Sequence, residues 1–269
     1  MSIAVSKKVG TVFQKTLPLS NGRTIPQVGL GCYGIKEQSS IESALDAGYL
    51  HFDTAGFYKN EKFVGKEIQD ASFMRATPRQ EYFVCSKIPP GFATYKKAPT
   101  IIQSSVKSVG LGFLDCMLLL WPGTQKMEEN DPINIENRHG CWKALEEAVE
   151  QQQIAGAGVS NFQTRHLEKL MEFSSMKPIL NQIECHPLYI DEDTIKFCQE
   201  NDIVVEAYAP FAQGNDKLLH NVTLNQIAAR NEIDVHQLIL LWCLQRGFVI
   251  LPRSSNAERQ KRNICLEGL

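Results

Sequence analysis

The chain has 269 residues and a formal net charge of −2 at pH 7, which suits one large domain or two small ones with a sizeable core. This charge balance does not indicate a broad nucleic-acid-binding surface. No apolar run approaches the length of a membrane-spanning helix, so membrane insertion is not expected.

The cysteines and the N-terminus indicate where the protein works. The eight cysteines stand singly, and none forms a C-x-x-C pair, so we expect reduced thiols in a cytoplasmic protein. Residues 1–12 are expected to be a flexible basic tail, because residues 1–8 lack the apolar core of a signal peptide. No acidic residue precedes Glu37, a bias also found in transit peptides, so organelle targeting stays an alternative.

The first expected element is a hairpin at residues 16–25, where Asn21-Gly22 separates alternating apolar residues. Short apolar segments and amphipathic segments then alternate to the end of the chain. The segments expected to be strands are 27–31, 49–52, 83–87, 115–120, 157–160, 179–184, 203–208 and 248–251. The segments expected to be helices are 37–47, 61–71, 99–111, 141–153, 165–173, 191–201, 223–231, 235–246 and 257–264. A charged loop, of a length that is usually functional or mobile, is expected from 123 to about 138.

Eight strand–helix units predict the fold. Short apolar strands that alternate with helices are typical of a parallel sheet, and eight such units predict a closed (β/α)₈ barrel of the TIM type. We therefore expect one α/β domain over residues 1–269, with the hairpin as a plug in the N-terminal mouth of the barrel. Functional residues in such barrels gather at the C-terminal ends of the strands.

Acid–base residues stand at two of these strand ends. Asp53 ends the second strand, Tyr58 follows five residues later, and Lys87 ends the third strand. A cation beside a phenol favours the phenolate, so a buried Asp53–Lys87 pair is expected to lower the pKa of Tyr58. Tyr58 could then act as a general acid.

The segment Asp53-Thr-Ala-x-x-Tyr-x-Asn-Glu61, followed by a lysine at the next strand end, resembles the aldo-keto reductase family. The resemblance covers roughly residues 16–264. It implies reduction of an aldehyde or ketone by hydride from NADPH. In that mechanism Tyr58 donates the proton, Lys87 lowers the pKa of Tyr58, and Asp53 holds Lys87.

The same resemblance implies the cofactor-binding residues for NADP(H). Ser160, Asn161 and Gln182 match the segments that hold the nicotinamide carboxamide, and Tyr208 matches the aromatic residue that stacks on the ring. The 2′-phosphate end is matched by Arg253, Ser254, Arg259 and Asn263. Guanidinium groups suit a phosphate because they bind it with two parallel hydrogen bonds.

The chain departs from the family pattern at one catalytic position. The family motif ends in His-Trp-Pro, whereas this chain has Leu120-Trp121-Pro122. Leu120 and Trp121 are expected to line the substrate pocket, and reductase activity is expected to be weakened. The chain also ends at Leu269, where the family pattern continues into a substrate-gripping tail.

These departures keep a second hypothesis open. The protein would then be a catalytically impaired relative that serves as a nucleotide-binding sensor or as a structural subunit with protein partners. The six histidines show no metal-ligand spacing, so no metal site is expected. No Gly-x-Gly-x-x-Gly motif follows the first strand, which argues against a Rossmann-type dinucleotide fold.

Overall fold

The computed structural model describes residues 10–269, and its centre is an eight-stranded parallel barrel. Each strand pairs with the next along the chain. The strands are β3 (Leu30–Gly31), β4 (His51–Asp53), β5 (Phe83–Ile88), β6 (Cys116–Leu119), β7 (Ala157–Ser160), β8 (Leu180–Glu184), β9 (Val204–Tyr208) and β10 (Val249–Leu251). A parallel bridge between Val28 and Ile250 joins the last strand to the first and closes the ring. The predicted (β/α)₈ barrel is confirmed.

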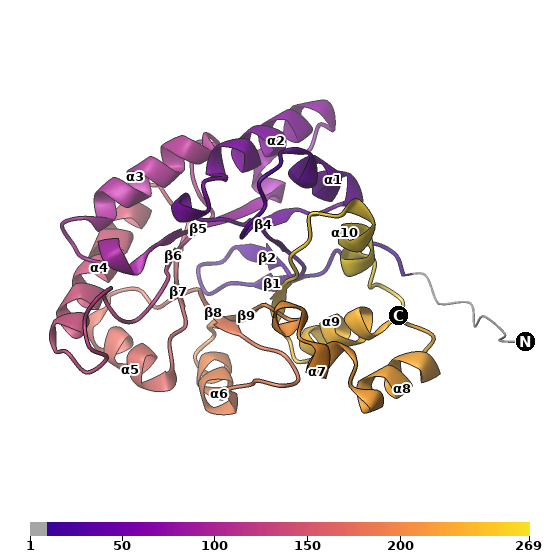
Figure 1. Ribbon diagram of the computed structural model, residues 1–269. Helices are drawn as coiled ribbons and strands as arrows, with labels where there is room; N and C mark the ends of the chain where they lie inside the picture. The colour runs from indigo at the N-terminus through magenta and orange to yellow at the C-terminus, as the bar shows by residue number, and fades with distance from the viewer. Residues whose placement is uncertain (1–9) are drawn as a thin grey trace, which may run out of the picture.

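The helices form an outer layer around the strands (Figure 1). They are α1 (Ser39–Ala47), α2 (Glu61–Met74), α3 (Ala98–Val109), α4 (Ile133–Glu150), α5 (Thr164–Phe173), α6 (Glu192–Glu200), α7 (Asp216–Leu219), α8 (Val222–Arg230), α9 (Val235–Gln245) and α10 (Ala257–Ile264). Apolar faces of these helices, except α7 and α8, pack with the barrel strands in one large core. No helix in the described residues is long and apolar enough to cross a membrane.

The hairpin of β1 (Thr16–Pro18) and β2 (Thr24–Pro26) plugs the barrel, and in Figure 1 it lies in the middle of the ring of helices. Leu19 and Ile25 are buried against residues of several barrel strands in a second, smaller core. The Arg23 guanidinium donates to Asp115 Oδ1 at 2.7 Å, just before β6 begins. These contacts place the hairpin at the N-terminal mouth and confirm the predicted plug.

The start of α4 differs from the expectation. A loop was expected to about residue 138, but the helix begins at Ile133. Asp131 accepts from the Ile133 amide at 2.9 Å, and Pro132 precedes the first turn. The buried Asn134 side chain accepts from Thr124 N at 2.8 Å. These contacts bend the polar segment back over the barrel and allow its second half to become helical, although its composition is typical of a loop.

The N-terminal segment is partly described. Residues 1–9 of the tail expected at 1–12 lie outside the described residues. Thr11 exchanges two backbone hydrogen bonds of 3.0 Å with Glu267, so the segment from residue 10 onward pairs with the C-terminal end of the chain.

Candidate active site

A buried ion pair forms the base of the site. Asp53 ends β4 and Lys87 lies in β5, so neighbouring parallel strands present both side chains at the C-terminal end of the barrel. The Lys87 ammonium donates to both carboxylate oxygens of Asp53 and to Thr54 O at 3.3 Å. Burial lowers the pKa of Lys87, but Asp53, together with Tyr58 and Cys85, outweighs burial and raises it, so the lysine stays charged.

Tyr58 lies beside this pair. It ends a short 3₁₀ turn (Gly56–Tyr58) between β4 and α2, and the Lys87 ammonium is 5.1 Å from the centroid of its ring. Burial raises the pKa of Tyr58 to about 12, while Lys87 opposes this shift and Asp53 adds to it. Lys87 lowers the pKa of Tyr58 as expected, but burial outweighs it and Asp53 opposes it, so the expected net lowering of the pKa is wrong. The phenol remains a proton donor at neutral pH.

The rest of the Asp-Thr-Ala-x-x-Tyr-x-Asn-Glu segment fixes the turn that carries Tyr58. The Asn60 amide donates to Cys32 O and Ile35 O, and its oxygen accepts from the Thr54 hydroxyl at 2.6 Å. Glu61 accepts from the Ser86 hydroxyl at 2.6 Å, next to Lys87 in β5. The other polar residues of the motif thus hold the loop against the barrel, and the Tyr58 hydroxyl is left available as a proton donor.

A second buried ionisable pair lies beneath Asp53, and the sequence did not single it out. Gln182 Nε2 donates to Asp53 Oδ1 at 2.9 Å and to Glu206 Oε2 at 2.6 Å. His51 Nε2 is 3.3 Å from the other Glu206 oxygen, and both residues are fully buried. A Cβ atom on Gly29 would lie 2.6 Å from the His51 ring, so the lack of a side chain at Gly29 leaves room for the imidazole. The sequence signal that could have revealed this pair was Glu206, a glutamate within the otherwise apolar β9 segment.

This pair predicts an unusual pH dependence of stability. Burial, and then Asp53, raises the pKa of Glu206 from 4.5 to about 8, while burial lowers the pKa of His51 from 6.5 to about 4. From pH 4.5 to 6.5 the Glu206 shift makes stability fall as pH rises, whereas the His51 shift makes it rise, so the two effects oppose each other. Between pH 6.5 and 8 the unfolded state binds fewer protons than the folded state, so stability falls as pH rises, by about 2 kcal/mol in total.

Glu206→Gln is expected to remove this fall while keeping an acceptor for Gln182. Urea unfolding of both proteins at pH 6.5 and pH 8 measures the difference. Glu150→Gln, which changes an exposed glutamate, is the control and should keep the wild-type fall. An equal loss of stability in wild type and Glu206→Gln would contradict the assignment.

The predicted nicotinamide-binding residues lie together at the ends of β7, β8 and β9. The Tyr208 hydroxyl donates to Asn161 Oδ1 at 2.8 Å, and Asn161 Nδ2 donates to Leu120 O at 3.0 Å. The Ser160 hydroxyl donates to Gln182 O at 2.9 Å. These bonds, together with those from Gln182 Nε2 to Asp53 and Glu206, fix the four side chains and leave Gln182 Oε1 as an acceptor.

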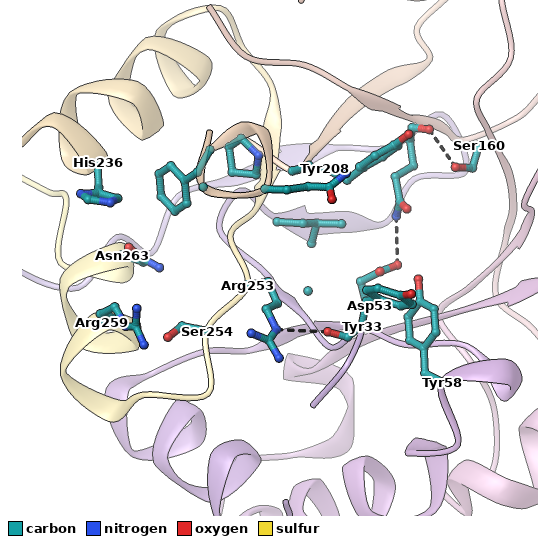
Figure 2. A pocket seen from close by; sticks show the side chains of 18 of the residues that line it. Tyr33, Asp53, Tyr58, Ser160, Tyr208, His236, Arg253, Ser254, Arg259 and Asn263 are labelled. Atoms are coloured by element: carbon teal, nitrogen blue, oxygen red, sulfur yellow. Dashed lines mark hydrogen bonds between the residues drawn. The ribbon is translucent and has the colours of Figure 1, made fainter. Parts of the chain in front are cut away.

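The predicted phosphate-binding residues lie around the start of α10. Figure 2 shows Ser254, Arg259 and Asn263 together, with Arg253 between them and Asp53. Arg253 donates to Tyr33 O at 3.1 Å and to Gly34 O at 2.9 Å, so it also fastens the loop after β3. The Arg259 guanidinium has no hydrogen bond or ion pair with any residue from 10 to 269. Asn263 is buried, and the Ser254 hydroxyl accepts from Asn256 N at 3.1 Å.

One cavity of about 740 Å³ connects the two clusters. Of the thirteen predicted site residues, all except Lys87 line it, and Lys87 lies just below, bound to Asp53. Leu120 contributes an apolar wall, and the half-exposed Trp121 stands at the rim. Tyr33 and His236 also line the cavity and were missed, because no strand-end pattern marks loop and helix residues. No group of potential metal ligands occurs in the described residues.

Comparisons with known proteins show which family the chain resembles. The model of the Aldo/keto reductase family matches residues 36–266. The chain belongs to this family. A glyoxal reductase of Bacillus subtilis is 34% identical over 93% of this chain and 86% of its own length. A glycerol 2-dehydrogenase (NADP(+)) of Hypocrea jecorina is 32% identical over 95% of this chain and 88% of its own.

Solved structures of aldo-keto reductases share the fold. An aldo/keto reductase from Brucella melitensis has a TM-score of 0.85 and 32% identity, covering 96% of this chain and 95% of its own. A Bombyx mori aldo-keto reductase in complex with NADP has a TM-score of 0.85 and 28% identity, covering 96% and 89%.

Proposed function

We propose that the protein is an NADPH-dependent reductase of aldehydes or ketones, with activity weakened by Leu120. The observation that carries this proposal is the Asp53–Lys87–Tyr58 cluster at one end of a cavity that is lined by Arg253 and, at its other end, by Arg259. Relatives named glyoxal reductase and glycerol 2-dehydrogenase (NADP(+)) support the same class of reaction.

The residues of the site fit NADP(H). NADP(H) is a long molecule, so it requires hydrogen-bond donors at both ends of the cavity, and the cavity has such donors at both ends. When bound, the cofactor supplies the hydride for the carbonyl carbon. Ser160, Asn161 and Gln182 would orient the nicotinamide carboxamide. The Tyr208 ring would form one wall of the nicotinamide-binding site. Tyr58 would hold the carbonyl oxygen and transfer its proton to that oxygen, and solvent would restore the phenol.

Arg259 motivates a prediction on cofactor choice. Its guanidinium is unpaired among the described residues, whereas Arg253 is already bonded to Tyr33 O and Gly34 O. We expect NADPH to bind about tenfold more tightly than NADH, or about 1.4 kcal/mol, and Arg259→Ala to remove most of this preference. Fluorescence titration with each cofactor measures it.

Lys261→Ala is the matched control, because it removes an exposed cation from the same helix. It should keep the preference for NADPH. Equal affinities of the wild type for both cofactors, or an unchanged preference in Arg259→Ala, would refute the prediction.

Leu120 favours a second candidate function, a nucleotide-binding sensor or structural subunit without significant turnover. A leucine at this position offers no hydrogen-bond donor to a carbonyl oxygen. Steady-state NADPH consumption with a panel of aldehydes separates the two candidates. Reduction of activated aldehydes supports the reductase; NADPH binding without consumption across the panel supports the sensor.

A further inference from the structure

A second cavity of about 650 Å³ lies beside the first. Trp121, Asn161 and Tyr208 line both cavities, so these three residues form the partition between them. The other walls are the loop after β6, the first half of α4 and the turns that follow β7 and β8. The cavity therefore adjoins the end of the barrel where the carbonyl chemistry is proposed.

Arg138 is the notable residue of this cavity. It lies on α4, lines the cavity and is only 8% exposed. Its Nη1 donates to Pro122 O at 2.6 Å. Within residues 10–269 its other guanidinium N–H groups have no protein acceptor, and it forms no ion pair. Burial lowers the pKa of Arg138, and Arg165 adds to that shift. Its remaining guanidinium N–H groups are accessible from the cavity, where water or an anion can accept from them. Because most of the guanidinium is out of bulk water and no carboxylate of the described residues pairs with it, an anion at these groups is favourable.

Two neighbouring residues add hydrogen-bond donors to the wall. Arg165 and His166 begin α5 and line the same cavity. His166 Nδ1 accepts from the Gln163 amide at 3.1 Å, so a neutral imidazole carries its proton on Nε2 and can donate it. Burial, and then Arg138 and Arg165, lowers the pKa of His166 to about 4.

The carboxylates that line the cavity already have other partners. Glu129 pairs with Arg165, and Glu184 Oε1 is 3.0 Å from His186 Nε2. Asp191 caps α6 by accepting from the amide and hydroxyl of Thr194 at 3.1 and 2.8 Å. Each of these carboxylates interacts with a residue near it, and none of them pairs with Arg138.

We propose that this second cavity binds a small anion, a carboxylate or phosphate group, with Arg138 as its main ligand and His166 as a second donor. The anion is either a free small molecule or the charged end of the carbonyl substrate. The second source rests on the proposed reductase function; anion binding itself does not.

Inorganic phosphate is the probe for binding. It is titrated at constant ionic strength, balanced with chloride, while NMR follows the Arg138 Nε–H resonance, which is assigned by its loss in Arg138→Gln. The titration uses the Arg259→Gln background, because Arg259 offers phosphate a second site. We expect a saturable shift of this resonance. An Arg138 resonance that phosphate does not move overturns the proposal.

Arg138→Gln keeps a donor for Pro122 O and removes the charge. By calorimetry we expect it to bind phosphate roughly tenfold to a hundredfold more weakly, as lost charged hydrogen bonds imply. Arg138→Lys, which keeps the charge, should lose less affinity. Arg230→Gln, which changes an exposed arginine on α8, should bind as the wild type does. Unchanged affinity in Arg138→Gln also overturns the proposal.

Steady-state kinetics with an aldehyde that bears a carboxylate, and with its methyl ester, identify the source of the anion. If the anion belongs to the substrate, Arg138→Gln raises KM for the acid about tenfold or more but not for the ester, and phosphate competes with the acid. If it is a free molecule, acid and ester respond alike and phosphate does not compete. Absence of turnover would contradict the reductase function and leave the phosphate titration as the test of the site.

Discussion

Tyr58→Phe is expected to abolish carbonyl reduction while leaving NADPH affinity nearly unchanged. The phenol is the proton donor placed beside the Lys87 ammonium, and its pKa of about 12 keeps it protonated at neutral pH. A positioned general acid contributes about 10²–10⁴-fold in rate. Here the loss should lie at the upper end, because Leu120 leaves Tyr58 as the donor for the carbonyl oxygen.

Steady-state turnover and fluorescence titration of NADPH measure the two quantities for Tyr58→Phe. The control is Tyr95→Phe, which removes a hydroxyl bonded to Glu147 at 3.0 Å on the exposed surface. It should change neither quantity. Wild-type turnover in Tyr58→Phe would show that the proton comes from another group, and the proposed mechanism would be wrong.

Leu120→His is expected to raise turnover at least tenfold without changing NADPH affinity. An imidazole at this position could donate to the substrate oxygen and stabilise negative charge as the hydride arrives. Loss of one such donor typically costs about 10²–10³-fold in turnover, roughly 2.7–4 kcal/mol. Its introduction next to Trp121 should recover part of that factor. For the wild type we expect weak reduction of activated aldehydes, with unactivated ketones almost untouched.

Leu120→Ala is the control for space in the pocket, because it shortens the side chain without adding a donor. The backbone bond from Asn161 to Leu120 O remains possible in both variants. An equal gain in the alanine variant would attribute the effect to room for substrate, not to hydrogen bonding. Leu120→His proteins that bind NADPH but still reduce no carbonyl would favour the sensor function.

The barrel and the position of the cluster were predictable because each signal is local. Short apolar strands such as residues 83–87 end on a polar side chain, and parallel strands bring all such ends to one mouth. Asp53 and Lys87 therefore meet although 33 residues separate them. The hairpin followed from Asn21-Gly22, whose turn geometry is almost independent of the rest of the chain.

The features that sequence reasoning missed depend on tertiary burial. The pKa of Tyr58 reflects burial and Asp53, which raise it, competing with Lys87, which lowers it, and the direction of the net shift depends on the three-dimensional surroundings. Glu206 reads as one polar residue in an apolar strand until the fold places it against His51. The early start of α4 depends on contacts of Asn134 with a loop that has no regular pattern.

Transfer of deuterium tests the central claim most directly. The wild type and Leu120→His are incubated with NADPH deuterated at the transferable C4 position and with an activated aldehyde, and the product is analysed by mass spectrometry. The account predicts an alcohol with deuterium on the former carbonyl carbon, formed slowly by the wild type and faster by Leu120→His. Tight NADPH binding with no deuterated alcohol from either protein would contradict it.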